Sequence, residues 1–140
     1  MELKTREDYL RVMYEIYEKQ DSEERDSGIK SVDVATFLNV SRASVSEINR
    51  KLKTNGLVES KKYTKVQLTE KGLREAKKAV YRHRVIEVFL VKILKYNAED
   101  INMEAETHRL EHAFSEESVK RLDNLLQNPK LCPHGKKIHK

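Results

Sequence analysis

Two short helical patterns follow each other so closely that they limit the fold more than any other feature. Apolar residues recur at helical spacing in both patterns: Val34, Phe37 and Leu38 in the first, and Val45, Ile48 and Leu52 in the second. Ser31 and Ser41 precede them as N-cap candidates, and only Asn39 and Val40 separate them. Gly56 suits the left-handed terminator of the second helix, with Leu57 placed to pack back on it. Two helices joined by so tight a turn resemble a helix-turn-helix.

A pair of short strands is expected directly after the second helix. Residues 57–60 and 65–68 have strand character, and the connection between them carries Lys61 and Lys62. A hairpin with cations at its tip makes the combination a winged helix-turn-helix. Such a unit usually binds DNA, although winged helices also serve as protein-interaction modules.

The remaining sequence predicts helices on both sides of this unit. A first helix is expected over about 7–19 with Thr5 as its N-cap, and the charged segment 20–30 is expected to be a mobile surface loop. Thr69 caps a long helix to about Leu94, Asn97 caps another to about Phe114, and Ser115 begins a last helix that Pro129 stops. We therefore expect a mainly α protein, with a winged helix-turn-helix DNA-binding domain over 1–75 and a helical domain over 76–140.

Charge is distributed unevenly along the chain. Overall, 28 Lys and Arg face 23 Asp and Glu, but from Gly28 to Glu75 ten basic residues face five acidic ones. From Glu99 to Glu117, in contrast, seven carboxylates face the single Arg109. A basic front half suits the phosphates of double-stranded DNA, and an acidic patch suits a cation. The residues expected to contact DNA lie early on the second helix and on the wing: Ser41, Arg42, Ser44, Ser46, Glu47, Arg50 and Lys62.

Cysteine content and hydropathy indicate a cytoplasmic protein. Cys132 is the single cysteine, so no internal disulfide can form. The sequence contains no apolar leader segment and no run of about 18 to 20 apolar residues long enough to span a membrane. We therefore expect no membrane partner.

Histidines and carboxylates recur at helical spacing in the second half. His108 lies four residues after Glu104, and Glu111 and His112 lie three and four residues after His108. This spacing places the four side chains along one helix face. His83 and Glu87, also four apart, interrupt the apolar stripe of the long helix. Each His and Glu pair taken alone would be a solvated surface or a hydrogen-bonded buried pair, but two such faces together favour a metal site.

The donor types narrow the chemistry of this site. Imidazole and carboxylate donors without thiolate suit Mn²⁺, Fe²⁺, Co²⁺ or Zn²⁺. The HExxH motif of zinc peptidases is absent, and so is the Glu-x-x-His pattern of di-iron bundles. We therefore do not expect an enzyme or an organic substrate. A winged-helix regulator that senses a non-metal ligand and, with less support, a metalloenzyme remain the alternatives.

Six segments follow one another along the chain: Asp8-Tyr9-Leu10, Ser41-Arg42-Ala43-Ser44-Val45-Ser46, Leu68-Thr69-Glu70-Lys71-Gly72, His83-Arg84-Val85-Ile86-Glu87, the stretch from His108 to Ser115, and Cys132-Pro133-His134-Gly135. In this order they resemble the DtxR/MntR family of metal-dependent repressors over nearly the whole chain. The chain is similar to the compact form of the family, which lacks a C-terminal barrel domain.

The resemblance implies a homodimer that binds a palindromic operator when it is loaded with a divalent metal. It implies one ligand group of Asp8, His108, Glu111 and His112, and a second of His83, Glu87 and Glu104. Mn²⁺ is slightly favoured over Fe²⁺, with Zn²⁺ third. Asp8 by itself would be only the capping partner of Thr5. Cys132 and His134 are expected to form a C-terminal strap against the last helices in preference to a Cys-x-His ligand pair.

Overall fold

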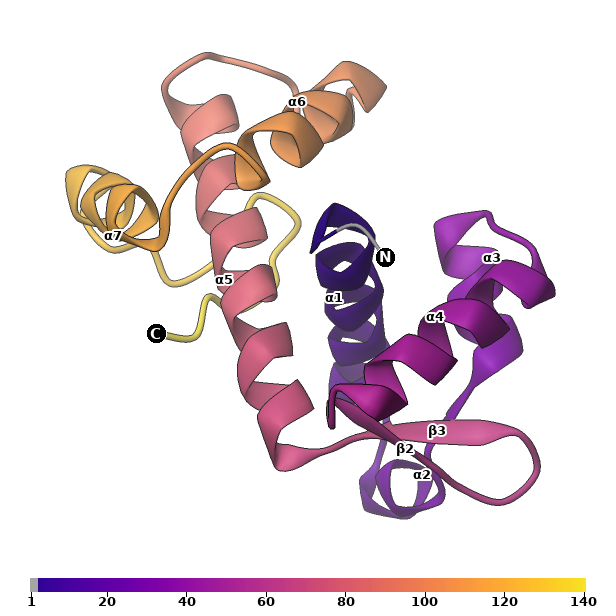
Figure 1. Ribbon diagram of the computed structural model, residues 1–140. Coiled ribbons are helices and arrows are strands. Elements are labelled where there is room, and N and C mark those ends of the chain that lie inside the picture. The colour runs from indigo at the N-terminus through magenta and orange to yellow at the C-terminus, as the bar shows by residue number, and fades with distance from the viewer. Residues whose placement is uncertain (1–2) are drawn as a thin grey trace. The chain divides into compact units, whose positions relative to one another are not determined.

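The computed structural model describes residues 3–140, with side chains from Arg6 onward. The chain is mainly helical and divides into two compact units, one ending at Lys77 and the other spanning Lys78–Lys140 (Figure 1). The elements are α1 (Leu3–Lys19), α2 (Ser22–Ser27), β1 (Ile29–Lys30), α3 (Ser31–Leu38), α4 (Arg42–Thr54), β2 (Val58–Ser60), β3 (Lys65–Leu68), α5 (Glu70–Lys92), α6 (Ile101–Glu111) and α7 (Glu116–Leu125). Within the described residues, no helix is both long and apolar enough to cross a membrane.

The helix-turn-helix forms as predicted, because each side of its turn is satisfied locally. α3 ends at Leu38, and its C-cap Asn39 has a left-handed φ of 55°. The Ser41 side chain accepts a hydrogen bond from the Ser44 N–H and caps α4. At the other end of α4, Gly56 has a φ of 73°, and the Leu57 N–H donates to the Leu52 carbonyl at 2.9 Å. α1, α3 and α4 pack against one another, and the predicted apolar face of α4, formed by Val45, Ile48 and Leu52, is buried. The face predicted for α3 is only partly covered, because Val34 is buried but Phe37 is 53% exposed.

The predicted wing also forms, but as part of a three-stranded antiparallel sheet. The strand order is β1-β3-β2, with Val58 opposite Leu68 and Ile29 opposite Val66 (Figure 1). Tyr63 and Thr64, at the hairpin turn, both have positive φ, as the central residues of a type I′ hairpin turn do. The wing is thus hydrogen-bonded to the segment that precedes α3.

That segment corrects one prediction, since residues 20–30 are ordered as α2 and β1. Asp21 and Glu24 form a capping box at the start of α2: the Asp21 side chain accepts from the Glu24 N–H at 2.9 Å, and Glu24 accepts from the Asp21 N–H at 3.0 Å. The predicted mobile loop is therefore wrong.

Two helix starts in this unit also differ from prediction. α1 begins at Leu3, so Thr5 lies inside the helix and is not its cap. Ser31 is likewise the first residue of α3, behind Lys30 as N-cap. The Ser31 hydroxyl donates to the Thr64 carbonyl of the wing turn at 3.3 Å, so it serves a tertiary contact.

The C-terminal unit surrounds α5 with α6, α7 and the chain that follows them. Thr69 caps α5 as predicted, accepting from the Gly72 N–H at 3.0 Å, and Ser115 caps α7. α6 begins at Ile101 behind Asp100, which accepts from the Asn102 N–H. The prediction that Asn97 caps α6 is wrong, because Asn97 instead closes a local turn with the Glu99 N–H. The core of the unit consists mainly of apolar residues: Val85, Ile86, Val88, Leu90, Met103, Val119, Leu122, Leu126, Cys132 and Ile138.

Candidate metal centre and nucleic-acid interface

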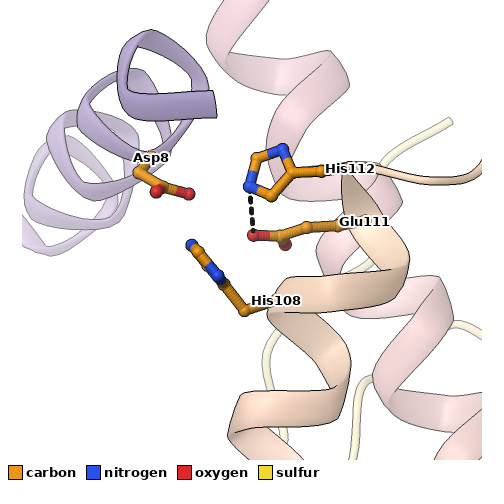
Figure 2. Close-up of side chains that lie close together, drawn as sticks. All are labelled: Asp8, His108, Glu111 and His112. Atoms are coloured by element: carbon orange, nitrogen blue, oxygen red, sulfur yellow. Dashed lines mark ion pairs between the residues drawn. The ribbon is translucent and has the colours of Figure 1, made fainter. Parts of the chain in front are cut away.

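Three predicted ligands converge at the end of α6. His108, Glu111 and His112 each offer a ligand atom, and these atoms lie within 4.8 Å of one another. Glu111 Oε1 is 3.5 Å from His112 Nε2, and the rings of His108 and His112 meet edge to face with centroids 4.9 Å apart (Figure 2). The spacing that predicted a shared face has therefore brought two imidazoles and a carboxylate together.

Glu111 is held in place by a residue from α5. Its side chain is 5 % exposed, and its Oε2 lies 2.6 Å from Nδ1 of His83. A second imidazole therefore contacts the carboxylate oxygen that does not face His112. Outer partners of this kind orient a ligating carboxylate and adjust its basicity. In this structure His83 is thus placed to support Glu111.

The second predicted group is only partly assembled. His83 Nε2 lies 3.7 Å from Glu87 Oε1, so these two side chains form the expected i, i+4 pair on α5. Glu104 is exposed and belongs to neither cluster of potential ligands within the described part of the chain. Asp8 lies on α1 of the N-terminal unit and is drawn with the α6 residues in Figure 2. Its participation in a site is part of the proposal below.

A different group forms around Glu87. Ligand atoms of Glu87, Cys132 and His134 lie within 4.8 Å of one another. Glu87 Oε2 is 3.0 Å from His134 Nδ1, while His134 Nε2 is 2.9 Å from the Ala98 carbonyl. A carbonyl only accepts, so Nε2 carries a hydrogen, and Nδ1 of a neutral ring directs its lone pair at the carboxylate. A proton or a metal ion between them satisfies that arrangement.

The strap predicted for the C-terminal segment is present as well. Leu131 bridges Lys137, the Cys132 N–H donates to the Lys136 carbonyl at 2.8 Å, and the buried Arg84 donates to the Lys137 carbonyl at 2.7 Å. The strap therefore carries Cys132 and His134 to α5. The Cys-x-His spacing was the sequence signal for this cluster, but it does not reveal that Glu87 is the third member.

The predicted DNA-contacting residues form an exposed surface on α4 and the wing. All seven are exposed: Ser41, Arg42, Ser44, Ser46, Glu47, Arg50 and Lys62. Their buried neighbours Val45, Ile48 and Leu52 hold the opposite face of α4 against the unit. The exposed face therefore combines short hydroxyl side chains with cations, which suits phosphate contacts and close approach to a groove.

One cation of this surface is already paired. Arg50 Nη2 lies 2.6 Å from Glu47 Oε1, one helical turn away. The hydrogen bond to Arg50 lowers the pKa of the Glu47 carboxyl, and the same bond raises the pKa of Arg50. Lys62, at the wing turn, makes no ion pair with any residue the structure describes. Before DNA binds, Arg50 is therefore already paired with a carboxylate, whereas Lys62 is not.

Comparison with known proteins identifies two family models that match successive parts of the chain. Residues 2–66 match the family model described as the iron dependent repressor, N-terminal DNA binding domain. Residues 69–140 match the one described as the iron dependent repressor, metal binding and dimerisation domain. The two matches together cover nearly all of the chain.

Individual relatives of this chain are named as transcriptional regulators and repressors. An uncharacterised HTH-type transcriptional regulator of Methanocaldococcus jannaschii is 37% identical over 83% of this chain and 87% of its own length. The iron-dependent repressor IdeR of Mycobacterium tuberculosis is 31% identical over 96% of this chain, which spans 55% of IdeR. The solved structure of the manganese regulator SloR superposes with a TM-score of 0.81 at 39% identity, covering 96% of this chain and 59% of the SloR chain. This chain thus spans little more than half of the longer relatives.

Proposed function

Because the chain belongs to the iron-dependent repressor family, we propose that it is a cytoplasmic DNA-binding transcriptional regulator whose operator affinity depends on a bound divalent metal. Residues 1–75 would form the DNA-binding domain and residues 76–140 the metal-binding and dimerisation domain. The observation that carries the proposal is the convergence of His108, Glu111 and His112 at the end of α6. A regulator, in contrast to an enzyme, also agrees with its relatives, which are named as transcriptional regulators and repressors.

We assign the primary metal site to Asp8, His108, Glu111 and His112. Two imidazoles and two carboxylates form a donor set that suits Mn²⁺ or Fe²⁺, with Zn²⁺ also accommodated. The bound ion would supply positive charge that offsets the two carboxylates. His83 would orient Glu111 through the 2.6 Å contact between Nδ1 and Oε2.

The cluster of Glu87, Cys132 and His134 is the second assigned site. It adds a buried sulfur donor, so it differs in chemistry from the group on α6. His83 contacts both Glu87 and Glu111, and therefore lies between the two clusters. Glu104 stays a predicted ligand in the group of His83 and Glu87. Its side chain is exposed here, so it would have to move toward these two residues to bind the same ion.

Asp8 explains how ligation would affect DNA binding. It belongs to α1 of the DNA-binding half, whereas the other three ligands belong to the metal-binding half. Ligation by all four residues would restrict the position of each DNA-reading surface within a dimer. Without a bound cation, the Asp8 and Glu111 carboxylates would repel each other and several arrangements would be populated. A state preferred about a hundredfold by the ion corresponds to roughly 2.7 kcal/mol of coupling.

A homodimer is proposed through the C-terminal unit. Large apolar side chains remain exposed on this unit: Ile93, Leu94, Ile101, Leu125 and Leu131. Exposed apolar residues on this scale suit a protein interface. Two copies would place two winged helices on the half-sites of a palindromic operator.

The proposal is tested by fluorescence anisotropy with palindromic DNA selected from a random pool, in saturating MnCl₂ and in EDTA. We expect Mn²⁺ to increase operator affinity by about a hundredfold, and we expect Asp8→Ala and Glu111→Gln to remove most of this increase. Glu106→Gln is the matched control, since Glu106 lies on α6 and pairs with Arg109 at the surface. Equal affinities in MnCl₂ and EDTA, repeated with Fe²⁺ and Zn²⁺, would refute a metal-dependent regulator.

The second site is tested with Co²⁺, because a thiolate ligand produces an intense near-ultraviolet charge-transfer band. We expect Cys132→Ser to lose this band while Asp8→Ala retains it. A wild-type protein that binds Co²⁺ without the band would exclude Cys132 as a ligand.

A further inference from the structure

Three consecutive hydrogen bonds cross the N-terminal unit from α1 to the wing. The Tyr9 hydroxyl donates to Asn49 Oδ1. Asn49 Nδ2 donates to the Ser31 hydroxyl oxygen at 3.2 Å, and the Ser31 hydroxyl donates to the Thr64 carbonyl at 3.3 Å. Each group thus donates to the next, so the bonds polarise one another in the same direction. We call this series the Tyr9–Thr64 relay.

The relay begins in the core, where a polar side chain is destabilising unless it is hydrogen-bonded. Tyr9 is fully buried, and Asn49 is 7 % exposed on the inner face of α4. An apolar residue at position 49 would continue the stripe made by Val45, Ile48 and Leu52. A buried amide in that position is costly unless its donors and acceptor are satisfied. Here both ends of the Asn49 amide are used, one toward α1 and the other toward α3.

Every link of the relay joins two different elements. The first joins α1 to α4, the second joins α4 to the start of α3, and the third joins α3 to the hairpin turn between β2 and β3. Asn49 directly precedes the exposed Arg50, and Thr64 lies two residues after Lys62. The relay therefore reaches both parts of the candidate DNA surface from one residue of α1.

That residue is next to a proposed metal ligand. Asp8 and Tyr9 are consecutive in α1, so a shift of the helix that moves one also moves the other. We propose that Tyr9, Asn49 and Ser31 are positioning residues that couple the place of α1 to the recognition helix α4 and the wing turn. This inference rests on the proposed function, because it requires the position of α1 to change when metal binds.

The test measures coupling in the full-length protein as the ratio of operator affinities in saturating MnCl₂ and in EDTA. Tyr9→Phe removes only the first hydrogen bond, whereas Ser31→Ala removes the second and the third, because the Ser31 hydroxyl both accepts from Asn49 and donates to Thr64. We expect Tyr9→Phe to lower the ratio by about fivefold, the size of one lost buried hydrogen bond, and Ser31→Ala to lower it by at least as much. The EDTA affinity of each variant should stay within about twofold of wild type. Tyr17→Phe is the matched control, because it makes the same chemical change on α1 outside the relay, and it should keep the wild-type ratio.

Two further measurements test the relay, one for the coupling and one for the contact at the wing turn. Thermodynamic linkage requires operator DNA to raise Mn²⁺ affinity by the same ratio, so this increase should fall by the same factor in Tyr9→Phe. Mn²⁺ affinity of the DNA-free protein should stay at the wild-type value. Hydrogen exchange should also show faster exchange in residues 61–65 of Ser31→Ala, including in the metal-free protein. An equal loss of affinity in MnCl₂ and EDTA, or unchanged exchange at the wing, overturns the relay.

Failure of the relay and failure of the proposed function give different results. If Asp8→Ala abolishes the metal response while Tyr9→Phe and Ser31→Ala keep the wild-type ratio, the relay is wrong and the metal-dependent regulator stands. If wild-type protein shows no metal response, both are wrong. If Tyr9→Phe does not fold, Ser31→Ala alone decides the outcome, since its hydroxyl lies toward the surface.

Discussion

Replacing Lys62 with Gln tests whether the wing contacts the DNA backbone. Lys62 is exposed at the hairpin turn and has no ion-pair partner among the residues described, so the substitution removes a cation without leaving a buried or unpaired charge. Each phosphate contact contributes about −0.9 to the slope of log affinity against log salt concentration. A dimer with two wings should therefore lose about 1.8 from the magnitude of its slope.

This change in slope predicts a measurable affinity difference. Over a rise from about 50 to about 200 mM salt, the wild-type advantage over Lys62→Gln should shrink by roughly twelvefold, which is about 4 raised to the power 1.8. The assay is operator anisotropy in saturating Mn²⁺ across a series of KCl concentrations. Lys120→Gln is the control for net charge, because Lys120 is exposed on α7 outside the candidate DNA surface.

Arg50 provides an internal comparison, because Glu47 already pairs with it at 2.6 Å. Glu47→Gln should strengthen operator binding and steepen the salt dependence, since it removes a carboxylate from the DNA-facing surface and releases the Arg50 guanidinium. Identical slopes for Lys62→Gln and wild type would refute wing contact with phosphate. A weaker operator complex for Glu47→Gln would instead indicate that Glu47 contacts a base or positions Arg50.

Two further predictions concern stability. Gly72→Ala should lower the free energy of unfolding in urea by about 3 kcal/mol, because its added Cβ would lie 1.9 Å from the Leu57 carbonyl oxygen; Arg74→Ala, at an exposed position of the same helix, should change it little. Burial raises the pKa of Tyr9 far above its ordinary value, so its contribution to stability should be complete below about pH 10 and be lost as the pH rises toward the raised pKa. Tyr9→Phe should therefore flatten the fall of the urea midpoint at alkaline pH.

Local patterns predicted the elements that are stabilised locally. The helix-turn-helix follows from apolar spacing, the Ser41 cap and the Gly56 terminator, all of which act within a few residues. β1 was missed because Ile29 is paired with Val66, a contact that no short window contains. The helix before it is missed for a different reason: the high charge of residues 20–30 is typical of a solvated loop, although Asp21 and Glu24 form a capping box there.

The difference between local and long-range contacts also applies to the candidate metal site. The proximity of His108, Glu111 and His112 was predictable, because helix geometry alone brings positions three and four apart onto one face. The group of Glu87, Cys132 and His134 depends on the C-terminal strap returning to α5, which spacing along the chain does not predict. Glu104 shared the helical spacing of α6, but its position near the start of the helix leaves it exposed.

The central place of β3 in the sheet limits where the wing can change in length. Both edges of this strand are hydrogen-bonded, to β1 and to β2, and Gln67 also donates to the Arg25 carbonyl. Insertions between Ser60 and Lys65 would extend the loop while leaving both ladders intact. Insertions within residues 65–68 would shift the register on two sides at once and turn Val66 out of the core. Natural variation in the reach of this hairpin should therefore be confined to its turn.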